Sequence, residues 1–157
     1  MITLKRTNSN DSDFSLLTMQ LDNELKTIYG ATQEEFDQYN EIADLQTVVI
    51  AYENNKPVGC GCFKQFDADS VEIKRMFVEP GQRGKGIGAF ILNELENWAA
   101  ETGYHSTVLE TGTAQPAAVQ LYKKLGYQII SNYHPYIGNA LSMCMKKLLA
   151  KNLQERL

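Results

Sequence analysis

The sequence predicts an α/β fold of the α+β kind, in which a mixed, mostly antiparallel central sheet of six or seven strands has helices on both faces. The first observation is the order of alternating and helical patterns, which is β-α-α-β-β-β-α-β-α-β-β. The second is that hairpin patterns precede a glycine-rich stretch and strand-helix-strand crossings follow it, so antiparallel and parallel pairs are both expected. The third is the length of 157 residues, 43% of them hydrophobic, which suits one domain over residues 1–157.

Capping and turn residues bound the elements of the first part of the chain. A polar cluster at residues 8–13 offers N-caps for a helix that Gly30 ends. Thr32 with Glu35 forms a capping-box pattern, which predicts a second helix. The polar residues 53–56 separate two strand-like segments, as expected for the turn of a hairpin.

Proline and glycine bound the later elements in the same way. Pro80 ends a strand, and Gly103 ends the helix that follows the glycine-rich stretch. Pro116 suits the first turn of a further helix, which Gly126 ends. The expected strands are residues 2–6, 47–52, 57–65, 70–78, 105–111, 127–130 and 141–148, and the expected helices are residues 14–29, 32–43, 87–102 and 116–125.

Charge is distributed unevenly along the chain. The net charge is −4, and the first 46 residues contain nine acidic against three basic residues. This distribution disfavours a nucleic-acid partner and is compatible with an anionic ligand at the later, more basic part of the chain. No apolar run approaches the ~20 residues of a membrane span, so no membrane association is expected.

Cysteine usage and the start of the chain indicate a cytoplasmic protein. The three cysteines are an odd number without C-x-x-C spacing, so neither a disulfide framework nor a metal site is expected. Cys60 and Cys62 are expected to lie on one face of a strand as small hydrophobic residues. The first residues lack the apolar region of a signal peptide. A monomer or a homodimer is expected.

A glycine-rich loop joins the strand at residues 70–78 to a helix that begins near Ile87. Gly84, Gly86 and Gly88 remove side chains where the helix starts, so backbone N–H groups can surround an anion at the positive end of the helix dipole. The loop therefore predicts a phosphate site. The strand before it is expected to alternate, with Val71, Ile73 and Phe77 on one face and Glu72, Lys74, Met76 and Val78 on the other.

Three kinds of phosphate ligand are compared for this loop. A P-loop needs Gly-x-x-x-x-Gly-Lys followed by Ser or Thr, which these glycines do not supply. The stretch from Gly84 to Ala89 fits the relaxed dinucleotide pattern G-x-G-x-x-A. A dinucleotide fold starts near its N-terminus and alternates strands with helices, whereas two helices and a hairpin are expected before this loop. A nicotinamide dinucleotide is therefore the weaker alternative. The third kind of phosphate ligand is suggested by a second motif later in the chain.

The second motif lies about 30 residues after the loop. Residues 83–88, Arg-Gly-Lys-Gly-Ile-Gly, have the form R/Q-x-x-G-x-G/A, and residues 118–127, Ala-Val-Gln-Leu-Tyr-Lys-Lys-Leu-Gly-Tyr, have the form A-x-x-L-Y-x-x-L-G-F/Y. Together the two motifs resemble the GNAT superfamily of acetyl-CoA-dependent N-acetyltransferases, and the resemblance covers about residues 47–147. It implies transfer of an acetyl group from acetyl-CoA to a primary amine of a small molecule, an amino acid or a peptide, by direct attack in a ternary complex.

The resemblance assigns the cofactor, acetyl-CoA or coenzyme A, to the strand and the loop. Backbone groups at the end of the strand would pair with the pantetheine arm, and backbone amides of the loop would hold the pyrophosphate. Gln115 stands where the family usually has an asparagine that contacts the cofactor, and this departure puts that contact in doubt. The implied cofactor residues are Met76, Phe77, Val78, Arg83, Gly84, Lys85, Gly86, Ile87, Gly88, Ala89, Gln115 and Tyr122.

Three residues are implied in catalysis. Tyr122 stands where the family has the tyrosine that protonates the departing thiolate, and core packing is the structural alternative for it. Glu72 and Glu110 each match the proton-accepting acid of a different branch of the family, with a slight preference for Glu72. A solvated carboxylate is the structural alternative for either acid. A protein that binds acyl-CoA without turnover is the functional alternative.

The resemblance also places the amine acceptor. In this fold the acceptor lies between the N-terminal helices and the loop before the last strand. Aromatic residues and the acidic N-terminal part suit a small amine, although a peptide amine fits as well. The candidate lining residues are Tyr29, Tyr39, Tyr133, His134, Tyr136 and Asn139.

Overall fold

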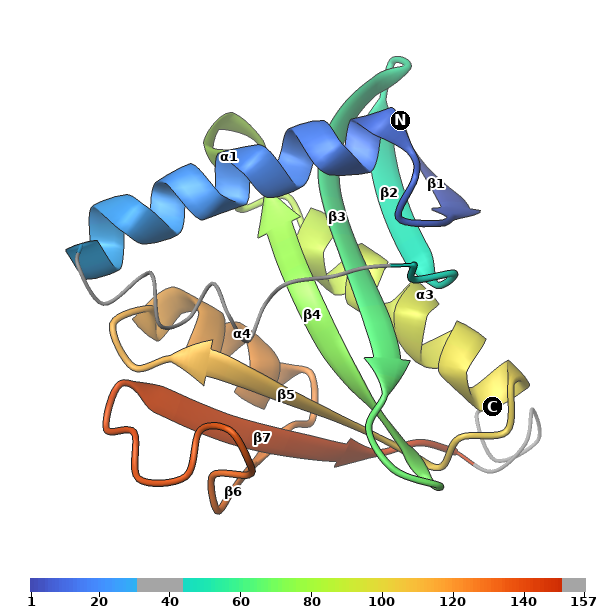
Figure 1. Ribbon diagram of the computed structural model, residues 1–157. Helices are drawn as coiled ribbons and strands as arrows, with labels where there is room; N and C mark the ends of the chain where they lie inside the picture. Colours follow the sequence, from blue (N-terminus) through green and yellow to red (C-terminus); the bar gives the residue numbers. More distant parts are fainter. Residues whose placement is uncertain (31–43, 151–157) are drawn as a thin grey trace. The chain divides into compact units, whose positions relative to one another are not determined.

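The computed structural model describes residues 1–30 and 44–150. Over these residues the order of strands and helices agrees with the expected one (Figure 1), and the helix expected at residues 32–43 lies outside the described part. The strands are β1 (Ile2–Thr7), β2 (Val48–Glu53), β3 (Lys56–Gln65), β4 (Ser70–Val78), β5 (Ser106–Gly112), β6 (Gln128–Ile130) and β7 (Ser142–Leu148), and the helices are α1 (Ser12–Tyr29), the short η2 (Pro80–Gln82), α3 (Ile87–Glu101) and α4 (Pro116–Lys124).

The seven strands are hydrogen-bonded in the order β1-β2-β3-β4-β5-β7-β6. The pairs β1–β2, β2–β3, β5–β7 and β6–β7 are antiparallel, whereas β4 and β5 are parallel. The prediction of a mixed, mostly antiparallel sheet is therefore confirmed. The parallel pair is expected where α3 provides the crossover between β4 and β5.

The chain divides into two compact units, which are described separately. The first unit consists of Met1–Phe63 with Lys74–Leu95, and the second consists of Lys64–Ile73 with Glu96–Leu157. Strand β4 contributes its first residues to the second unit and its last residues to the first. The single domain over residues 1–157 stays a prediction.

Helix α1 covers one face of the strands in the first unit. Its apolar residues recur at helical spacing, and three of them are buried against β2 and β3. Cys60 and Cys62 lie together in this buried cluster, in agreement with their predicted role as small hydrophobic residues on one strand face. The cluster consists of Phe14, Leu17, Leu21, Val48, Ile50, Cys60, Cys62 and Phe77.

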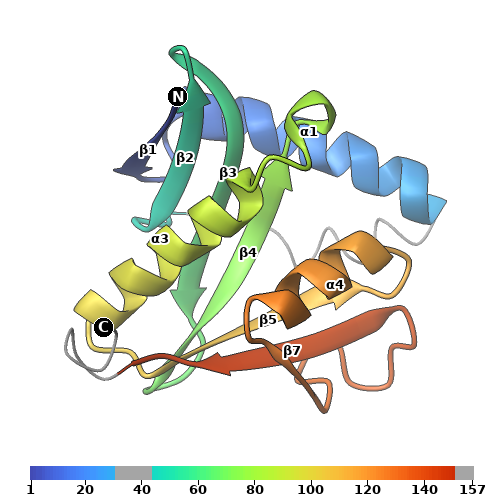
Figure 2. The ribbon, with the colours of Figure 1, turned by 180° about the vertical axis from the view of Figure 1, so that it is seen from behind.

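Helix α3 covers the opposite face of β3. Gly59 and Gly61 alternate with the two cysteines along this strand, so they face the other side. An added Cβ at Gly59 would lie 3.0 Å from the Ile91 Cδ1 atom, and one at Gly61 would lie 2.9 Å from Leu95 Cδ1, so α3 packs directly on the β3 backbone. Figure 1 shows α1 in front of β2 and β3, and Figure 2 shows α3 on their other side, so helices cover both faces as predicted.

Strand β4 is distorted at Arg75. This residue has φ = 58°, which is a left-handed and not an extended conformation. Its guanidinium forms an ion pair with Asp22 of α1, and its carbonyl accepts a hydrogen bond from the Cys60 thiol at 3.4 Å. The strict alternation predicted from Val71 to Val78 is therefore wrong beyond Lys74, because a left-handed residue within the strand shifts the alternation of the residues after it.

The second unit is built on β5 and its two partners. β5 pairs with β4 from Ser70↔Ser106 onward and with β7 from Ser106↔Leu148. The segment before β7 is organised by Asn132, whose Nδ2 lies 3.0–3.2 Å from three backbone carbonyls. Among the residues that the structure describes, no helix is both long and apolar enough to cross a membrane.

Asp11 is the N-cap of α1, as the polar cluster predicts. Its carboxylate accepts hydrogen bonds from the Asp13 N–H at 3.0 Å and the Thr7 hydroxyl at 3.0 Å, and Lys5 Nζ lies 2.7 Å away. Burial by itself would raise the pKa of Asp11, but these three donors together hold it below its usual value of 3.8. The folded state therefore favours the charged carboxylate.

Replacing Asp11 tests this cap. We expect Asp11→Ala to lower the free energy of unfolding by about 1 kcal/mol near neutral pH, because the first turn of α1 loses its acceptor. Asp11→Asn keeps a capping oxygen and is the matched control, with a smaller loss. Because the folded pKa lies below the unfolded one, the contribution of the charge is fully present above the unfolded value of 3.8 and is lost as the pH falls through the folded pKa. Urea unfolding of all three proteins, near neutral pH and at low pH, measures both effects; equal losses for the Ala and Asn variants would contradict the capping role.

Candidate functional site

The glycine-rich loop lies in the first unit, between η2 and α3. Gly84 has φ = 83° and Gly86 has φ = 82°, a left-handed conformation that glycine adopts without strain. An added Cβ at either glycine would meet no atom within 4 Å, so the loop presents its backbone on an open side. The predicted start of the helix near Ile87 is confirmed, with Gly88 and Ala89 in its first turn.

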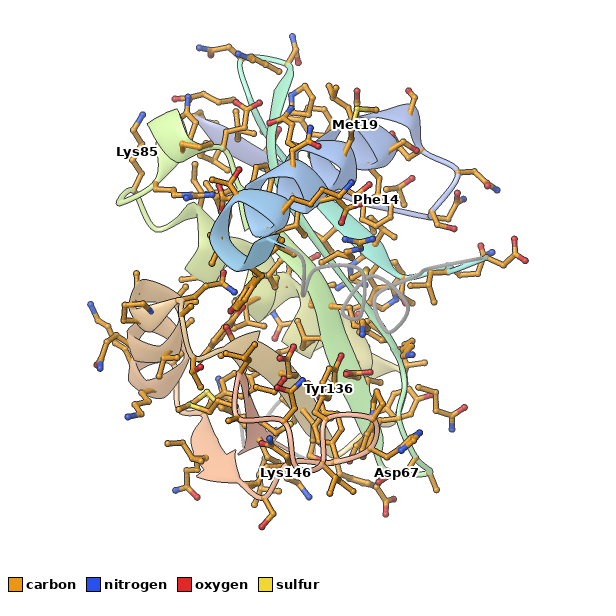
Figure 3. All side chains as sticks on the ribbon, turned by 60° about the vertical axis from the view of Figure 1, so that its left-hand side comes forward. Phe14, Met19, Asp67, Lys85, Tyr136 and Lys146 are labelled. Carbon is orange, nitrogen blue, oxygen red and sulfur yellow. The ribbon has the colours of Figure 1, made fainter. Side chains whose placement is uncertain are left out.

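The charges around this loop suit an anion. The first N–H groups of a helix have no partner within the helix and form its positive end. Helix α3 has no acidic residue in its first turn. The exposed Lys85 side chain projects outward from the loop (Figure 3), and its Nζ lies 3.0 Å from the Gln82 side-chain oxygen. The local geometry can therefore hold a phosphate group.

Arg83 is held by the first unit through its side chain. Its Nε donates to the Val78 carbonyl at 2.8 Å, and its Nη2 lies 2.9 and 2.7 Å from the two Glu24 carboxylate oxygens. Its backbone N–H lies 3.4 Å from the Pro80 carbonyl. The amides that remain for a ligand are thus those after Arg83, and the Arg83 side chain fastens the loop to β4 and α1.

Burial differs among the three residues at the end of β4 that the resemblance implies in cofactor binding. Phe77 is 5% exposed and belongs to the core cluster, so its side chain packs inward. Met76 and Val78 are half-buried. Phe77 therefore contributes its side chain to the core, whereas the side chains of Met76 and Val78 are the partly exposed ones of this segment.

The two candidate acids lie on one face of the sheet in the second unit. The Ser70 and Ser106 hydroxyls are 2.5 Å apart, so these paired residues share a face. Glu72 and Glu110 follow them at even spacing and therefore point to the same side. The negative charges of both acids raise the pKa of the Cys144 thiol on β7, although burial is the larger cause, and that pKa is about 11. Both predicted acids thus belong to one polar cluster.

Glu72 is almost completely buried and has defined partners. It is 5% exposed, and its Oε2 accepts a hydrogen bond from the Tyr133 hydroxyl at 3.0 Å. Lys64 Nζ lies 3.8 Å from Oε1. Tyr133 packs edge-on against Phe66, with ring centroids 4.7 Å apart. Burial first, and then the charge of Glu72, raise the pKa of Tyr133 far above its usual value, so Tyr133 is a neutral donor to the carboxylate.

Tyr122 lies on α4 and is 8% exposed. Burial, followed by the negative charge of Glu110, raises the pKa of its phenol to about 12. The phenol therefore keeps its proton across the physiological range and can act as a donor. Gln115 is the residue before α4, and its side chain makes no capping hydrogen bond with the helix.

The residues predicted to line an acceptor site are distributed over both units. Tyr29 is the last residue of α1 in the first unit, and Tyr39 lies outside the described residues. Tyr136 is 1% exposed, packs 5.8 Å from Tyr133 between ring centroids, and accepts from the Asn139 N–H through its carbonyl at 3.0 Å. Tyr136 therefore supports the loop more than it presents a surface, and His134 beside it is exposed.

Asn132, which the sequence patterns do not single out, holds this loop together. Besides its three carbonyl contacts, its Oδ1 accepts from the Cys144 N–H at 3.3 Å. The available signal is its position in a segment rich in Asn, Gly and Pro, where asparagine side chains commonly bond to the backbone. Tyr133 is predicted only as a lining residue of the acceptor site, whereas its hydroxyl bonds to Glu72.

Comparison with known proteins identifies the family of the chain. Residues 16–127 match the acetyltransferase (GNAT) family. An IAA acetyltransferase of Azospirillum brasilense is 33% identical over 141 residues, which cover 85% of this chain and 88% of that protein.

Solved structures share the fold over nearly the whole chain. A protein of Klebsiella pneumoniae described as an acyl-CoA N-acyltransferase is 29% identical with a TM-score of 0.79, covering 95% of this chain and 98% of that one. A GNAT acetyltransferase of Elizabethkingia anophelis, solved with acetyl-CoA bound, is 22% identical with a TM-score of 0.65 and covers 94% of this chain and 98% of that one. The protein is an acyltransferase enzyme that belongs to the GNAT acetyltransferase family.

Proposed function

We propose that this protein transfers an acetyl group from acetyl-CoA to a primary amine, by direct attack of the amine in a ternary complex. The observation that carries the proposal is the loop before α3, where two left-handed glycines and the helix N-terminus present N–H groups on an open side. The acetyl-CoA bound to the Elizabethkingia relative supports this donor.

The loop fits the pyrophosphate of coenzyme A. The amides from Gly84 to Ala89 can surround phosphate oxygens, and the absence of acidic residues from the first turn of α3 leaves the dipole uncompensated. Acetyl-CoA supplies a thioester carbonyl, whose bond to sulfur breaks when the amine nitrogen bonds to the carbon. The residues of the second unit serve the two proton transfers that this exchange requires.

Glu72 is proposed to take the proton from the acceptor, directly or through water. A lysine-like amine has a pKa of about 10.4 and arrives as ammonium, so it cannot attack before it loses a proton. The Tyr133 hydroxyl orients the Glu72 carboxylate through its hydrogen bond at 3.0 Å. Glu110, on the same face, is the alternative base.

Tyr122 is proposed to give its proton to the departing sulfur. Its pKa of about 12 keeps the phenol neutral until the sulfur becomes negative, and the phenolate then takes a proton from solvent. The net result is an amide, a thiol and one released proton, so charge and atoms balance.

The cysteines do not suit a covalent acyl intermediate. Burial raises the pKa of Cys60 far above its usual value, and that of Cys144 to about 11. A nucleophilic cysteine needs a lowered pKa and access to its substrate. Direct transfer is therefore preferred, and an acyl-cysteine trapped with acetyl-CoA would contradict it.

A panel of acceptors tests the activity. Release of the CoA thiol is measured with monoamines, diamines, amino acids and peptides, and with IAA because of the name of the Azospirillum relative. Thiol release with at least one amine is expected. Tight acetyl-CoA binding by calorimetry, with no release from any acceptor, would instead indicate a sensor, and binding of NAD in place of acetyl-CoA would overturn the loop assignment.

Gly86→Asp tests the loop. The added carboxylate would face the pyrophosphate, so we expect affinity for acetyl-CoA to fall at least about tenfold. Gly103→Asp is the matched control, because Gly103 also has a positive φ, 103°, and open space around its Cα but lies in the turn after α3. Calorimetry on both variants separates the charge at the loop from the strain of a left-handed aspartate. Equal affinities in the two variants would refute the site.

Tyr122→Phe tests the proton donor. Removal of the hydroxyl leaves the ring packing in place, so kcat is expected to fall about 100-fold or more while affinity for acetyl-CoA stays within about twofold. Steady-state kinetics with the best acceptor of the panel measures both quantities. An unchanged kcat would leave core packing as the only role of Tyr122.

Glu72→Gln and Glu110→Gln separate the two candidate bases. If Glu72 is the base, its amide variant loses kcat near neutral pH, and the loss shrinks as the pH approaches the acceptor pKa of about 10, because solvent then supplies the free amine. Glu110→Gln, on the same sheet face, serves as the comparison and should show no such pH-dependent recovery. The reverse pattern in a pH profile of kcat would assign the role to Glu110.

A further inference from the structure

A chain of buried hydrogen bonds ties Tyr127 to three elements of the second unit. Tyr127 is 3% exposed, and its hydroxyl donates to Glu96 Oε2 of α3 at 2.8 Å. The same hydroxyl lies 2.6 Å from Thr107 Oγ1 of β5. The other Glu96 oxygen accepts from Lys147 Nζ of β7 at 2.8 Å. The Tyr127 phenol thus links the segment after α4 to α3 and β5 directly, and to β7 through Glu96.

The donors and acceptors of this hydrogen-bonded network allow only one set of bond directions. An ionised carboxylate only accepts, so the one proton of the Tyr127 hydroxyl goes to Glu96. Thr107 must then donate to the Tyr127 oxygen. Burial, and next the charge of Glu96, raise the pKa of Tyr127 far above its usual value, which keeps this proton in place. The direction of every bond is therefore set, and so is the orientation of the Tyr127 ring.

Stability alone does not account for this network. Glu96 is 5% exposed and Thr107 is fully buried, so the carboxylate has lost most of its contact with water. Apolar side chains of similar volume commonly stabilise a core as well as or better than a buried ion pair does. What the network provides in addition is one fixed position for the ring at its end.

Tyr127 contacts the proposed proton donor directly. The rings of Tyr127 and Tyr122 pack edge to face, with centroids 5.9 Å apart and an interplanar angle of 67°. The Tyr127 N–H also donates to the Tyr122 carbonyl at 3.0 Å. Helix α4 has only nine residues and ends at Lys124, so Tyr122 lies in a last turn that the helix alone holds weakly.

We propose that Tyr127 is a positioning residue, which Glu96 and Thr107 hold through its hydroxyl so that its ring keeps Tyr122 aligned for proton transfer to the leaving sulfur. This inference rests on the proposed role of Tyr122. It assigns to the Glu96-Tyr127-Thr107 network a part in the reaction, although none of its members touches the reacting atoms.

Tyr127→Phe removes the anchoring hydroxyl and keeps the ring. The expected result is a fall in kcat on the order of tenfold, because small displacements of a reacting group are costly, with KM for acetyl-CoA within about twofold. Tyr104→Phe is the matched control, since it removes a tyrosine hydroxyl between α3 and β5, outside the network, and kcat should stay within about twofold. Thiol release with the best acceptor of the panel provides the assay.

The double variant Tyr122→Phe/Tyr127→Phe gives the decisive comparison. If Tyr127 acts only through the Tyr122 hydroxyl, the second change has no further effect on kcat once that hydroxyl is gone. A further fall of about tenfold in the double variant would mean a general structural role and overturn the inference. Tyr122→Phe with unchanged kcat overturns the proposed donor role itself. If kcat falls in Tyr122→Phe but is unchanged in Tyr127→Phe, the inference about Tyr127 is overturned and the proposed role of Tyr122 stands.

A thermal melt shows whether Tyr127→Phe is folded. If it is not, Thr107→Val provides a second test. Valine has nearly the shape of threonine and removes one of the bonds to the Tyr127 hydroxyl. We expect a fall in kcat of about threefold in the wild-type background and none in the Tyr122→Phe background. An unchanged kcat in the first background, or an equal fall in both, overturns the inference.

Discussion

Close packing of α3 on β3 determines where the glycine-rich loop lies in the first unit. Gly59 and Gly61 lie under the helix, where an added Cβ would come within 3.0 Å of Ile91 or Leu95 side-chain atoms. Side chains at these positions would push α3 away from the strand. The start of α3, and with it the loop that presents the helix N–H groups, therefore depends on two glycines that are far from the loop in the sequence. The position of the predicted anion site thus depends on backbone packing as well as on the glycines of the loop.

Buried acids in the second unit follow a common pattern. Glu72 and Glu96 are each 5% exposed, and each accepts a hydrogen bond from a tyrosine, Tyr133 and Tyr127 respectively. A buried carboxylate without donors would cost several kcal/mol, so these phenols make the burial tolerable. In both cases the bond also determines where a carboxylate or a ring points. The hydrogen bonds of this unit thus fix orientation, which the proposed proton transfers would require.

Local sequence patterns predicted much of the fold and part of the candidate site. The N-cap at Asp11, the helix start near Ile87 and the glycines of the loop were all predictable, because each depends on a few contiguous residues and on allowed values of φ. The alternation along β4 was not predictable, because Arg75 leaves the strand conformation in contact with Asp22, which is 53 residues away. Periodicity contains no information about such a distant partner.

Local patterns and tertiary contacts also inform different parts of the proposed chemistry. Contiguous motifs indicate the family and predict the cofactor loop, since a helix N-terminus and left-handed glycines are local properties of the backbone. Only the tertiary structure decides which groups surround the proposed proton donor and base. Tyr133 reaches Glu72 across 61 residues, and Tyr127 reaches Glu96 across 31. Strand register and helix packing bring these pairs together, and neither can be read from the spacing of the residues along the chain.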